Sequence, residues 1–474
     1  FEFNGFYIGS TSLGENPTLT ADNVAAIDET TPLVAKFTAT DDVTLFYDDD
    51  QYSYRIPAIA KTGNGMLVAV SDYRHNLDDI GRDKYNPGIK RIDLVMRTSD
   101  DNGLTWSAKQ TIAEGTSTFG YGDAAIVANG QDILVMAVAG NVFYPYANAT
   151  NKNKTYRIYS NDNGESWTKE EVTSNIFGLF DEAYATFFGS GKLAVDPNFN
   201  GTGNARIYGA LLVRIGTDGY NNFGVFSDDL GATWKILGGD NTNPVAKGDE
   251  PKVEILPNGQ ILLSARRGGG RVFRVFTYGD DKANGAGSWG DEAVNGCDNG
   301  GSNATNGEII CLDAKKPNGK PTKILLQSQP KGGSGQYDRK DVTIWYKEVS
   351  ADETYTSATI ASGWTMGKQV STVQSSYSAM CLQANGEIAL FFEEAPCYGN
   401  DYTKGYSMVY VPLTIEEITE NNFLNPNADV EYVPTEFNIV LTDAQDNEYC
   451  ETLDYIPNGV AAVESYLTTT YPFI

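Results

Sequence analysis

The sequence SDDNGLTW at residues 99–106 decides the fold, because the chain carries its pattern three times. A second copy, SNDNGESW, begins 61 residues later at 160–167, and a third, SDDLGATW, begins 67 residues after that at 227–234. Each copy reads Ser-x-Asp-x-Gly-x-Ser/Thr-Trp and follows a short stretch with the apolar pattern of a β-strand. The pattern predicts a hairpin turn in which glycine takes a positive φ, aspartate bonds the turn N–H groups, and tryptophan packs back on the sheet. Degenerate copies follow at 277–289 and 349–364.

A second series of turns alternates with the first. Most of its Asn-Gly pairs separate two apolar stretches, which is typical of a type I′ hairpin. The near-constant period indicates six units of four antiparallel strands, and therefore a six-bladed β-propeller. The pairs are spaced by 65, 71, 58, 60 and 67 residues and begin at Asn64, Asn129, Asn200, Asn258, Asn318 and Asn385.

The sixth unit lacks a clear fourth strand. It runs from Ser376 to about Pro412, and a strand between Thr38 and Phe46 would complete it from the other end of the chain. We therefore expect an all-β chain with three parts. These are an N-terminal extension at 1–35, a propeller at 36–427, and a C-terminal extension at 428–474 packed on the propeller.

The composition excludes several classes of protein. Lys and Arg number 35 and Asp and Glu 62, so the net charge of −27 argues against a nucleic-acid binder with a basic surface. His75 is the single histidine, which argues against a multi-histidine metal site and a Ser-His-Asp triad. The five cysteines contain no CxxC pair, so no zinc ribbon is expected. No apolar run approaches the ~18 residues of a membrane span.

Charged residues gather where the predicted first strands begin and the second strands end. Both positions lie on one rim of a propeller, opposite the two series of turns. Since the first strands line the axis, these side chains would converge on one axial pocket, and such charges are costly unless paired or functional. With Tyr377 among them, they are Arg55, Asp72, Arg74, Asp78, Asp79, Asp123, Glu250, Arg266, Arg267, Arg339, Glu393 and Glu394.

The sequence YRIP at residues 54–57, ahead of the repeated turns, resembles the exo-α-sialidase (neuraminidase) family of the bacterial and trypanosomal type. In that family the turns are called Asp boxes or BNR repeats. The resemblance runs from about Tyr54 to Glu394. It implies a glycoside hydrolase that acts with retention of configuration and uses no metal or other cofactor.

The resemblance places the binding of a substrate carboxylate on three arginines. Arg55, Arg266 and Arg339 match these arginines, and Glu393 matches a carboxylate that orients the first of them. Planar guanidinium groups, which stay charged, bind a carboxylate as a fork.

The resemblance also assigns the reacting groups. Tyr377 matches the nucleophile, Glu250 its partner, and Asp79 the acid/base. Arg74 and Asp123 match contacts to a ring hydroxyl and the N-acyl region. A carboxylate nucleophile would be repelled by the sialic acid carboxylate, whereas a neutral tyrosine is not. Asp78 and Asp83 lie close to Asp79 in sequence, and Glu254 is the alternative to Glu250.

These features lead us to expect a secreted, periplasmic or cell-surface exo-α-sialidase. It would be a monomer that removes terminal sialic acids from glycoproteins, glycolipids or oligosaccharides and binds no nucleic acid. The same residues would serve a sialyl transferase or an intramolecular trans-sialidase. A non-catalytic sialoglycan-binding propeller would be expected to lack Tyr377, Glu250 or Asp79. A hydrolase of neutral polysaccharide would not need three guanidinium groups.

Overall fold

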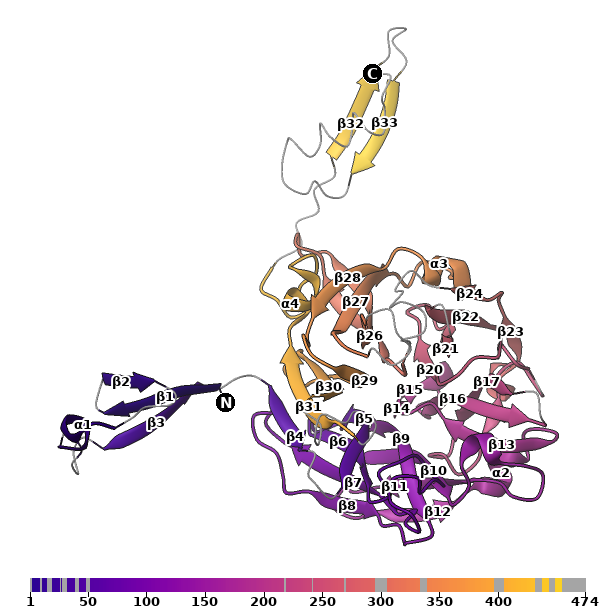
Figure 1. The fold of residues 1–474 in the computed structure, drawn as a ribbon. Coiled ribbons are helices and arrows are strands. Elements are labelled where there is room, and N and C mark those ends of the chain that lie inside the picture. Colours follow the sequence, from indigo (N-terminus) through magenta and orange to yellow (C-terminus); the bar gives the residue numbers. More distant parts are fainter. Residues whose placement is uncertain are drawn as a thin grey trace.

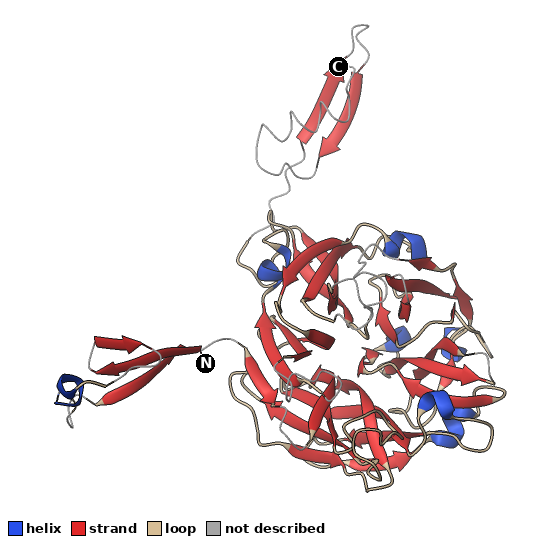
Figure 2. Cartoon of the chain, in the orientation of Figure 1, coloured by secondary structure: helices blue, strands red, loops and turns tan. Residues whose placement is uncertain are grey.

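The computed structural model describes residues 2–8, 11–14, 19–25, 27, 32–38, 42–47, 52–216, 219–240, 242–267, 270–294, 305–332, 339–395, 405–430, 437–442 and 448–453. The fold is all-β, with six sheets of four to six strands that follow one another around a common centre and are antiparallel except where β14 (Gly191–Lys192) pairs with β9 (Gly120–Asn129) (Figures 1 and 2). We number these sheets 1 to 6 in chain order.

The first three sheets contain the copies of the Ser-x-Asp turn. Sheet 1 consists of β5 (Ser53–Lys61), β6 (Leu67–Arg74), β7 (Ile92–Ser99) and β8 (Gln110–Ala113). Sheet 2 consists of β9 (Gly120–Asn129), β10 (Asp132–Gly140), β11 (Lys154–Ser160) and β12 (Thr168–Glu171), with β14 (Gly191–Lys192) beside β9. Sheet 3 consists of β13 (Ala183–Phe188), β15 (Ala194–Asp196), β16 (Arg206–Ile215), β17 (Tyr220–Ser227), β18 (Lys235–Ile236) and β19 (Val245–Ala246).

The other three sheets continue the pattern. Sheet 4 consists of β20 (Pro251–Ile255), β21 (Ile261–Arg267), β22 (Gly270–Tyr278), β23 (Gly287–Trp289) and β24 (Ala293–Val294). Sheet 5 consists of β25 (Ile309–Lys315), β26 (Pro321–Pro330), β27 (Val342–Val349) and β28 (Thr365–Gln369). Sheet 6 consists of β29 (Ser375–Leu382), β30 (Ile388–Glu394), β31 (Ser407–Leu413) and β4 (Val43–Phe46).

The remaining elements are short. Two further sheets are formed by β1 (Glu2–Ile8), β2 (Thr11–Gly14) and β3 (Leu33–Thr38), and by β32 (Phe437–Thr442) and β33 (Glu448–Leu453). The helices are α1 (Ala21–Ala25), α2 (Thr173–Phe177), α3 (Ser357–Ala361) and α4 (Ile415–Thr419), with 3-10 turns η1 (Tyr144–Tyr146), η2 (Phe199–Gly201) and η3 (Lys282–Asn284). None of the described helices has the length and apolar character needed to cross a bilayer.

The hydrophobic core lies between neighbouring sheets. Five main clusters of buried side chains each join two consecutive sheets, from sheets 1 and 2 through to sheets 5 and 6. The remaining main cluster joins sheet 6 to sheet 1 and contains Phe46, Tyr54 and Phe391. The apolar contacts therefore run around the whole series of sheets and return to its start.

β4 confirms the prediction that the N-terminal part of the chain completes the last unit. It pairs with β31, with Met408 opposite Phe46. The side chains of Leu45 and Phe46 are buried, and the Phe46 ring lies 5.2 Å from that of Tyr54 in sheet 1.

The Ser-x-Asp turns have the predicted geometry. In the first copy, the Ser99 hydroxyl accepts from the Gly103 N–H at 2.8 Å, and Asp101 accepts from the Thr105 N–H at 2.9 Å. Gly103 has a φ of 85°. The Trp106 indole donates back to the Gly103 carbonyl at 3.0 Å. The same bonds recur in the copies at 160–167 and 227–234.

The type I′ assignment is wrong for the Asn-Gly turns at 64–65, 129–130, 258–259, 318–319 and 385–386, whereas at 200–201 both residues have a positive φ, of 55° and 69°. Type I′ needs a positive φ at both central residues, whereas at 64–65 only Gly65 has one, of 94°. Its N–H donates to Thr62 O at 3.0 Å, and the Asn64 side chain accepts from the Met66 N–H at 3.3 Å. This side-chain cap recurs at Asn258, Asn318 and Asn385. The asparagine therefore caps a longer turn and the glycine alone supplies the left-handed residue.

The register of sheet 1 separates the turns from the predicted site. Lys61, Leu67 and Ser99 are opposite one another at the end that carries the turns. Arg55 and Asp72 are opposite one another near the other end. The Ser-x-Asp turn is thus a structural element remote from Arg55.

Bulges interrupt the inner strands where the candidate site residues lie. The register shifts between Arg55 and Ala58, between Met136 and Val138 opposite Asp123, and between Ser375 and Ser378 around Tyr377. Ile56 and Asp123 have positive φ values of 61° and 52°, which are unfavourable for side chains with a Cβ. Bulges re-aim side chains, and backbone strain of this kind gathers at functional sites.

Candidate active site

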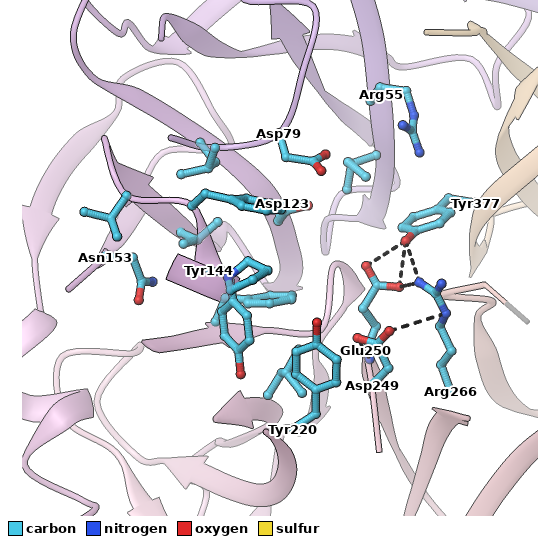
Figure 3. Close-up of a pocket in the computed structure, with 18 of the residues that line it drawn as sticks. Arg55, Asp79, Asp123, Tyr144, Asn153, Tyr220, Asp249, Glu250, Arg266 and Tyr377 are labelled. Atoms are coloured by element: carbon cyan, nitrogen blue, oxygen red, sulfur yellow. Dashed lines mark hydrogen bonds and ion pairs between the residues drawn. The ribbon is translucent and has the colours of Figure 1, made fainter. Parts of the chain in front are cut away.

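One pocket of about 300 Å³ collects most of the predicted residues. Seven of the nine residues with predicted roles line it: Arg55, Asp79, Asp123, Glu250, Arg266, Arg339 and Tyr377. Arg55, Asp123, Glu250 and Tyr377 lie at or near the starts of inner strands, Arg266 lies at the end of β21, and Asp79 and Arg339 lie in the loops that follow β6 and β26. Arg74 and Glu393 lie behind this lining and contact it. Figure 3 shows the convergence of the side chains on one space.

Tyr377 and Glu250 form the closest polar pair. The Tyr377 hydroxyl lies 2.7 Å from both carboxylate oxygens of Glu250 (Figure 3). Arg266 Nη1 donates to the same hydroxyl at 3.0 Å and to Glu250 Oε2 at 2.6 Å. Burial and the Glu250 carboxylate raise the pKa of Tyr377, against the effect of the nearby arginines. The phenol is therefore neutral in the resting protein and has a proton acceptor in contact.

Arg55 is fixed by Glu393. Arg55 Nε donates to Glu393 Oε1 at 2.7 Å, and this carboxylate also accepts from the backbone N–H groups of Ile56 and Tyr377 at 2.8 and 3.2 Å. Burial alone would raise the pKa of the fully buried Glu393, but Arg55 and these N–H donors lower it. Glu393 is therefore a charged anchor that joins the starts of β5 and β29.

Arg339 retains unused donor capacity. Its guanidinium carbon lies 5.4 Å from the centre of the Tyr377 ring, and Nη1 reaches Ser376 Oγ at 3.4 Å. Its buried Nε has no hydrogen-bond partner among the described residues. Arg55 lies over the same ring at 5.5 Å. An anion placed above Tyr377 would meet guanidinium groups from two sides.

Asp79 lies across the pocket from Tyr377 in Figure 3. Its Oδ1 accepts from Arg74 Nη1 at 2.8 Å, and 49% of its side chain is exposed. Burial would raise the pKa of this carboxyl, but Arg74 and Arg55 outweigh it, so the pKa lies below its usual value. Neighbouring Asp78 instead turns away and pairs with Arg82 at 3.2 Å.

Asp72 is buried behind the pocket lining, directly beside Asp123, which lines the pocket. Asp72 Oδ2 accepts from Arg74 Nη2 at 2.9 Å, and Asp72 Oδ1 accepts from the Asp123 N–H at 3.0 Å. Burial raises the pKa of Asp72 to about 6, although Arg74 opposes it. The pKa of Asp123 is also raised, by burial and then by Asp72. Three carboxyl groups thus surround Arg74.

Sequence reasoning missed the other wall of the pocket. This wall is mostly apolar and aromatic, and it includes Asp249, whose pKa is raised by burial. Asp249 Oδ2 lies 3.6 Å from Arg266 Nε. Its position directly before Glu250 was the only available signal, because the other wall residues lie in loops and strands without a repeated motif. They are Val138, Val142, Phe143, Tyr144, Pro145, Asn153, Phe187, Leu212 and Tyr220.

Among the described residues, no group of three or more His, Cys, Asp or Glu side chains could hold a metal ion. The polar groups of the pocket instead form an arginine-rich anion site with a tyrosine–carboxylate pair on one side and a carboxyl group on the other. This donor set suits an anionic organic ligand.

The sheets and their repeated turns define an all-β repeat protein, and comparison with known proteins gives its family. The chain belongs to the BNR repeat-like domain family, whose model matches residues 90–390. The resemblance to sialidases seen in the sequence is confirmed by curated relatives of that name. A sialidase of Paraclostridium sordellii is 29% identical over 231 residues, which cover 46% of this chain and 53% of the relative. A sialidase of Micromonospora viridifaciens is 24% identical over 384 residues, or 77% of this chain and 54% of the relative.

The matched regions span about half the length of these curated relatives. Among solved structures, the intramolecular trans-sialidase from Ruminococcus gnavus superposes with a TM-score of 0.62 at 15% identity. The match covers 81% of this chain and 99% of that one. At this identity the likeness concerns the fold.

Proposed function

We propose that this chain is an exo-α-sialidase that hydrolyses terminal sialic acids with net retention. The observation that carries the proposal is the contact of the Tyr377 hydroxyl with both oxygens of Glu250, directly beside three arginines. Sialic acid carries a carboxylate on its anomeric carbon. Arg55, Arg266 and Arg339 would bind that carboxylate and so place the anomeric carbon beside the phenol.

The first step forms a glycosyl–tyrosine bond. Tyr377 oxygen attacks the anomeric carbon while Glu250 accepts the phenolic proton, and the bond to the leaving oxygen breaks as Asp79 protonates it. Arg266 Nη1, 3.0 Å from the phenol oxygen, stabilises the negative charge that develops there.

The second step reverses the roles. Asp79, now ionised, removes a proton from water, the water oxygen attacks the anomeric carbon, and the bond to Tyr377 breaks. Glu250 returns the proton to the phenolate. Two inversions give net retention. The Asp79 carboxyl must be protonated for the first step, so a substrate that neutralises Arg55 would favour its active form.

We also propose the architecture in which this site sits. Sheets 1 to 6 are the blades of one six-bladed β-propeller formed by residues 36–427, with extensions at 1–35 and 428–474, most of which lies outside the described residues. The ring of core clusters and the pairing of β4 with β31 support this arrangement. Expected substrates are sialylated glycoproteins, glycolipids and oligosaccharides, and the expected setting is a secreted, periplasmic or cell-surface monomer.

A fluorogenic assay tests the function. Wild-type protein should release 4-methylumbelliferone from its N-acetylneuraminic acid glycoside in the presence of EDTA, and Tyr377→Phe should lower kcat by about a thousandfold or more. Tyr346→Phe serves as the control, because Tyr346 lies on β27, the third strand of sheet 5, and its hydroxyl accepts a hydrogen bond from Asn422. NMR of the first product would show the α-anomer for hydrolysis with retention and an anhydro sugar for intramolecular transfer. Absence of release by folded wild-type protein would refute the proposal.

A further inference from the structure

Asp79 lies in the loop at 75–91, which connects β6 to β7. Hydrogen bonds within the loop hold its shape, because the Asn76 amide donates to Asp79 O at 3.0 Å and to Arg82 O at 2.9 Å. Ile80 anchors it below, buried against Ile92 and Val138. These contacts fix the inner side of the loop. Its outer side packs against a neighbouring segment.

That neighbour is the pocket wall at 141–147, which connects β10 to β11. Gly81 has a φ of 79° and packs on the wall so closely that a Cβ there would lie 2.3 Å from Phe143 N. The Arg82 guanidinium lies 4.7 Å from the Phe143 ring. At the other end of the loop, Lys90 Nζ donates to Asn141 O at 3.1 Å. The loop therefore rests on the wall at two separated places.

The wall is in turn fastened by Arg214 on β16. Its Nη1 donates to Pro145 O at 2.5 Å and to Ala147 O at 2.9 Å, with Tyr144 O at 3.5 Å. One charged group thus binds three backbone carbonyls in and directly after the 3-10 turn η1. Arg214 does not line the pocket, so any effect on the reaction passes through the wall.

We propose that the wall at 141–147 sets the position of Asp79, and that Gly81 and Arg214 are positioning residues for proton transfer to the leaving group. The inference rests on the proposed function, in which Asp79 is the acid. A general acid must lie within hydrogen-bond reach of the leaving oxygen, and an error of about 1 Å can cost about a hundredfold in rate. A Cβ at residue 81 cannot fit without a shift of this size between loop and wall.

Two substrates with different leaving groups separate an effect on proton transfer from Asp79 from a general loss of activity. An umbelliferyl group leaves as a stabilised phenolate and needs little help from an acid, whereas the lactose of 3′-sialyllactose leaves as an alkoxide unless it is protonated. kcat/KM covers only the steps up to formation of the Tyr377 adduct. A displaced Asp79 should therefore lower kcat/KM for sialyllactose and spare the aryl substrate.

The main variant is Gly81→Ala, with Gly88→Ala as its matched control. Gly88 lies in the same loop with a φ of 84°, so alanine meets the same backbone cost, but a Cβ there has no atom within 4 Å. The second variant is Arg214→Met, with Arg274→Met as control, since Arg274 also donates to a loop carbonyl, that of Pro244 directly before β19. Arg214→Met leaves the sequence of the Asp79 loop unchanged, so it still tests the proposal if Gly81→Ala does not fold.

We expect Gly81→Ala and Arg214→Met to lower kcat/KM for sialyllactose at least about tenfold more than for the umbelliferyl substrate, and the controls to shift both equally. Equal losses on both substrates, or no loss, while wild type remains active, would overturn the inference and leave the proposed function standing. Wild-type protein that releases neither leaving group would refute the proposed function, and the inference with it.

Discussion

At the residue scale, Glu250 and Glu254 show how one strand carries two carboxylates with different tasks. Glu250 precedes β20 and contacts the Tyr377 hydroxyl, whereas Glu254 lies further along β20 and pairs with Lys192 at 2.7 Å. Glu250→Gln keeps a polar side chain but removes the proton acceptor. We expect kcat to fall by about a hundredfold to ten-thousandfold, as is usual for loss of a general base.

Glu254→Gln is the matched control for this prediction, because it makes the same change four residues away. It should lose stability through Lys192 but keep its kcat at 25 °C. Initial rates on the umbelliferyl substrate measure both variants. Comparable losses of kcat in Glu250→Gln and Glu254→Gln would mean that Glu250 has no special role in the reaction.

The Asp72–Asp123 pair makes stability depend on pH in an unusual direction. Burial raises the pKa of both groups, so the folded protein binds protons more tightly than the unfolded chain does. Their contribution is therefore fully present below the unfolded pKa near 4; the part due to Asp72 is lost as the pH rises through about 6, and the part due to Asp123 as the pH rises through its own raised pKa. Asp123→Asn removes one of these ionisations.

We expect Asp123→Asn to melt at a higher temperature than wild type at pH 7.5 and at the same temperature at pH 4. Thermal unfolding followed by circular dichroism across this range measures the difference. Asp240→Asn, at an exposed position, should show the wild-type pH dependence. A difference between Asp123→Asn and wild type that grows as the pH falls would contradict the assignment.

At the element scale, the repeated turn joins sheets as well as strands. Trp106 packs with the cluster between sheets 6 and 1, and Trp167 with that between sheets 1 and 2. Trp234, Trp289 and Trp364 likewise pack with the cluster between their own sheet and the preceding one. The turn sequence predicted the local geometry correctly, but not that its tryptophan would lie between sheets.

How much of an element could be predicted depended on whether its residues repeat. The Ser-x-Asp turns, the places of the Asn-Gly turns and most strands were predictable, because their spacing recurs through the chain. The inner strand of sheet 3 was not, since it is divided into β13 and β15, which pair separately with β16. The site residues at strand starts were predictable from their residue type and from their position relative to the predicted strands. The wall at 141–147 has no repeated partner, so only the folded chain brings it to the pocket.

Ser227 tests the structural role of the turn. Its buried hydroxyl accepts from the Gly231 N–H at 2.9 Å and donates to Asp229 Oδ1 at 2.8 Å. Ser227→Ala leaves the N–H of buried Gly231 unsatisfied and should lower the free energy of unfolding by about 1–3 kcal/mol. Because the turn lies away from the pocket, kcat should not change. Urea unfolding and the umbelliferyl assay give the two values.

Ser288→Ala, at an exposed position in β23 of sheet 4, is the control and should leave the unfolding free energy within about 0.5 kcal/mol of wild type. A loss of kcat in folded Ser227→Ala would show that the turns influence the site after all.

At the scale of the whole molecule, sheet 6 links the two ends of the repeat array to the candidate site. Its inner strand β29 carries Tyr377, β30 carries Glu393, and its outer strand β4 comes from the N-terminal part of the chain. Removal of β4 would expose the edge of β31 and the cluster that joins sheet 6 to sheet 1. Loss of the buried side chains of Leu45 and Phe46 alone would cost about 3–6 kcal/mol.

Two truncations separate this closure from the segment before it. Deletion of residues 1–41 keeps β4 and should retain wild-type activity and melting temperature. Deletion of residues 1–47 removes only six residues more and no residue of the pocket, yet it should lower the melting temperature and the activity together, because the sheet that holds Tyr377 and Glu393 loses its outer strand. Thermal unfolding and initial rates on the same preparations measure both effects. Equal behaviour of the two truncations would mean that β4 does not close the array, whereas loss of stability in the shorter deletion would give the segment at 1–41 a structural role of its own.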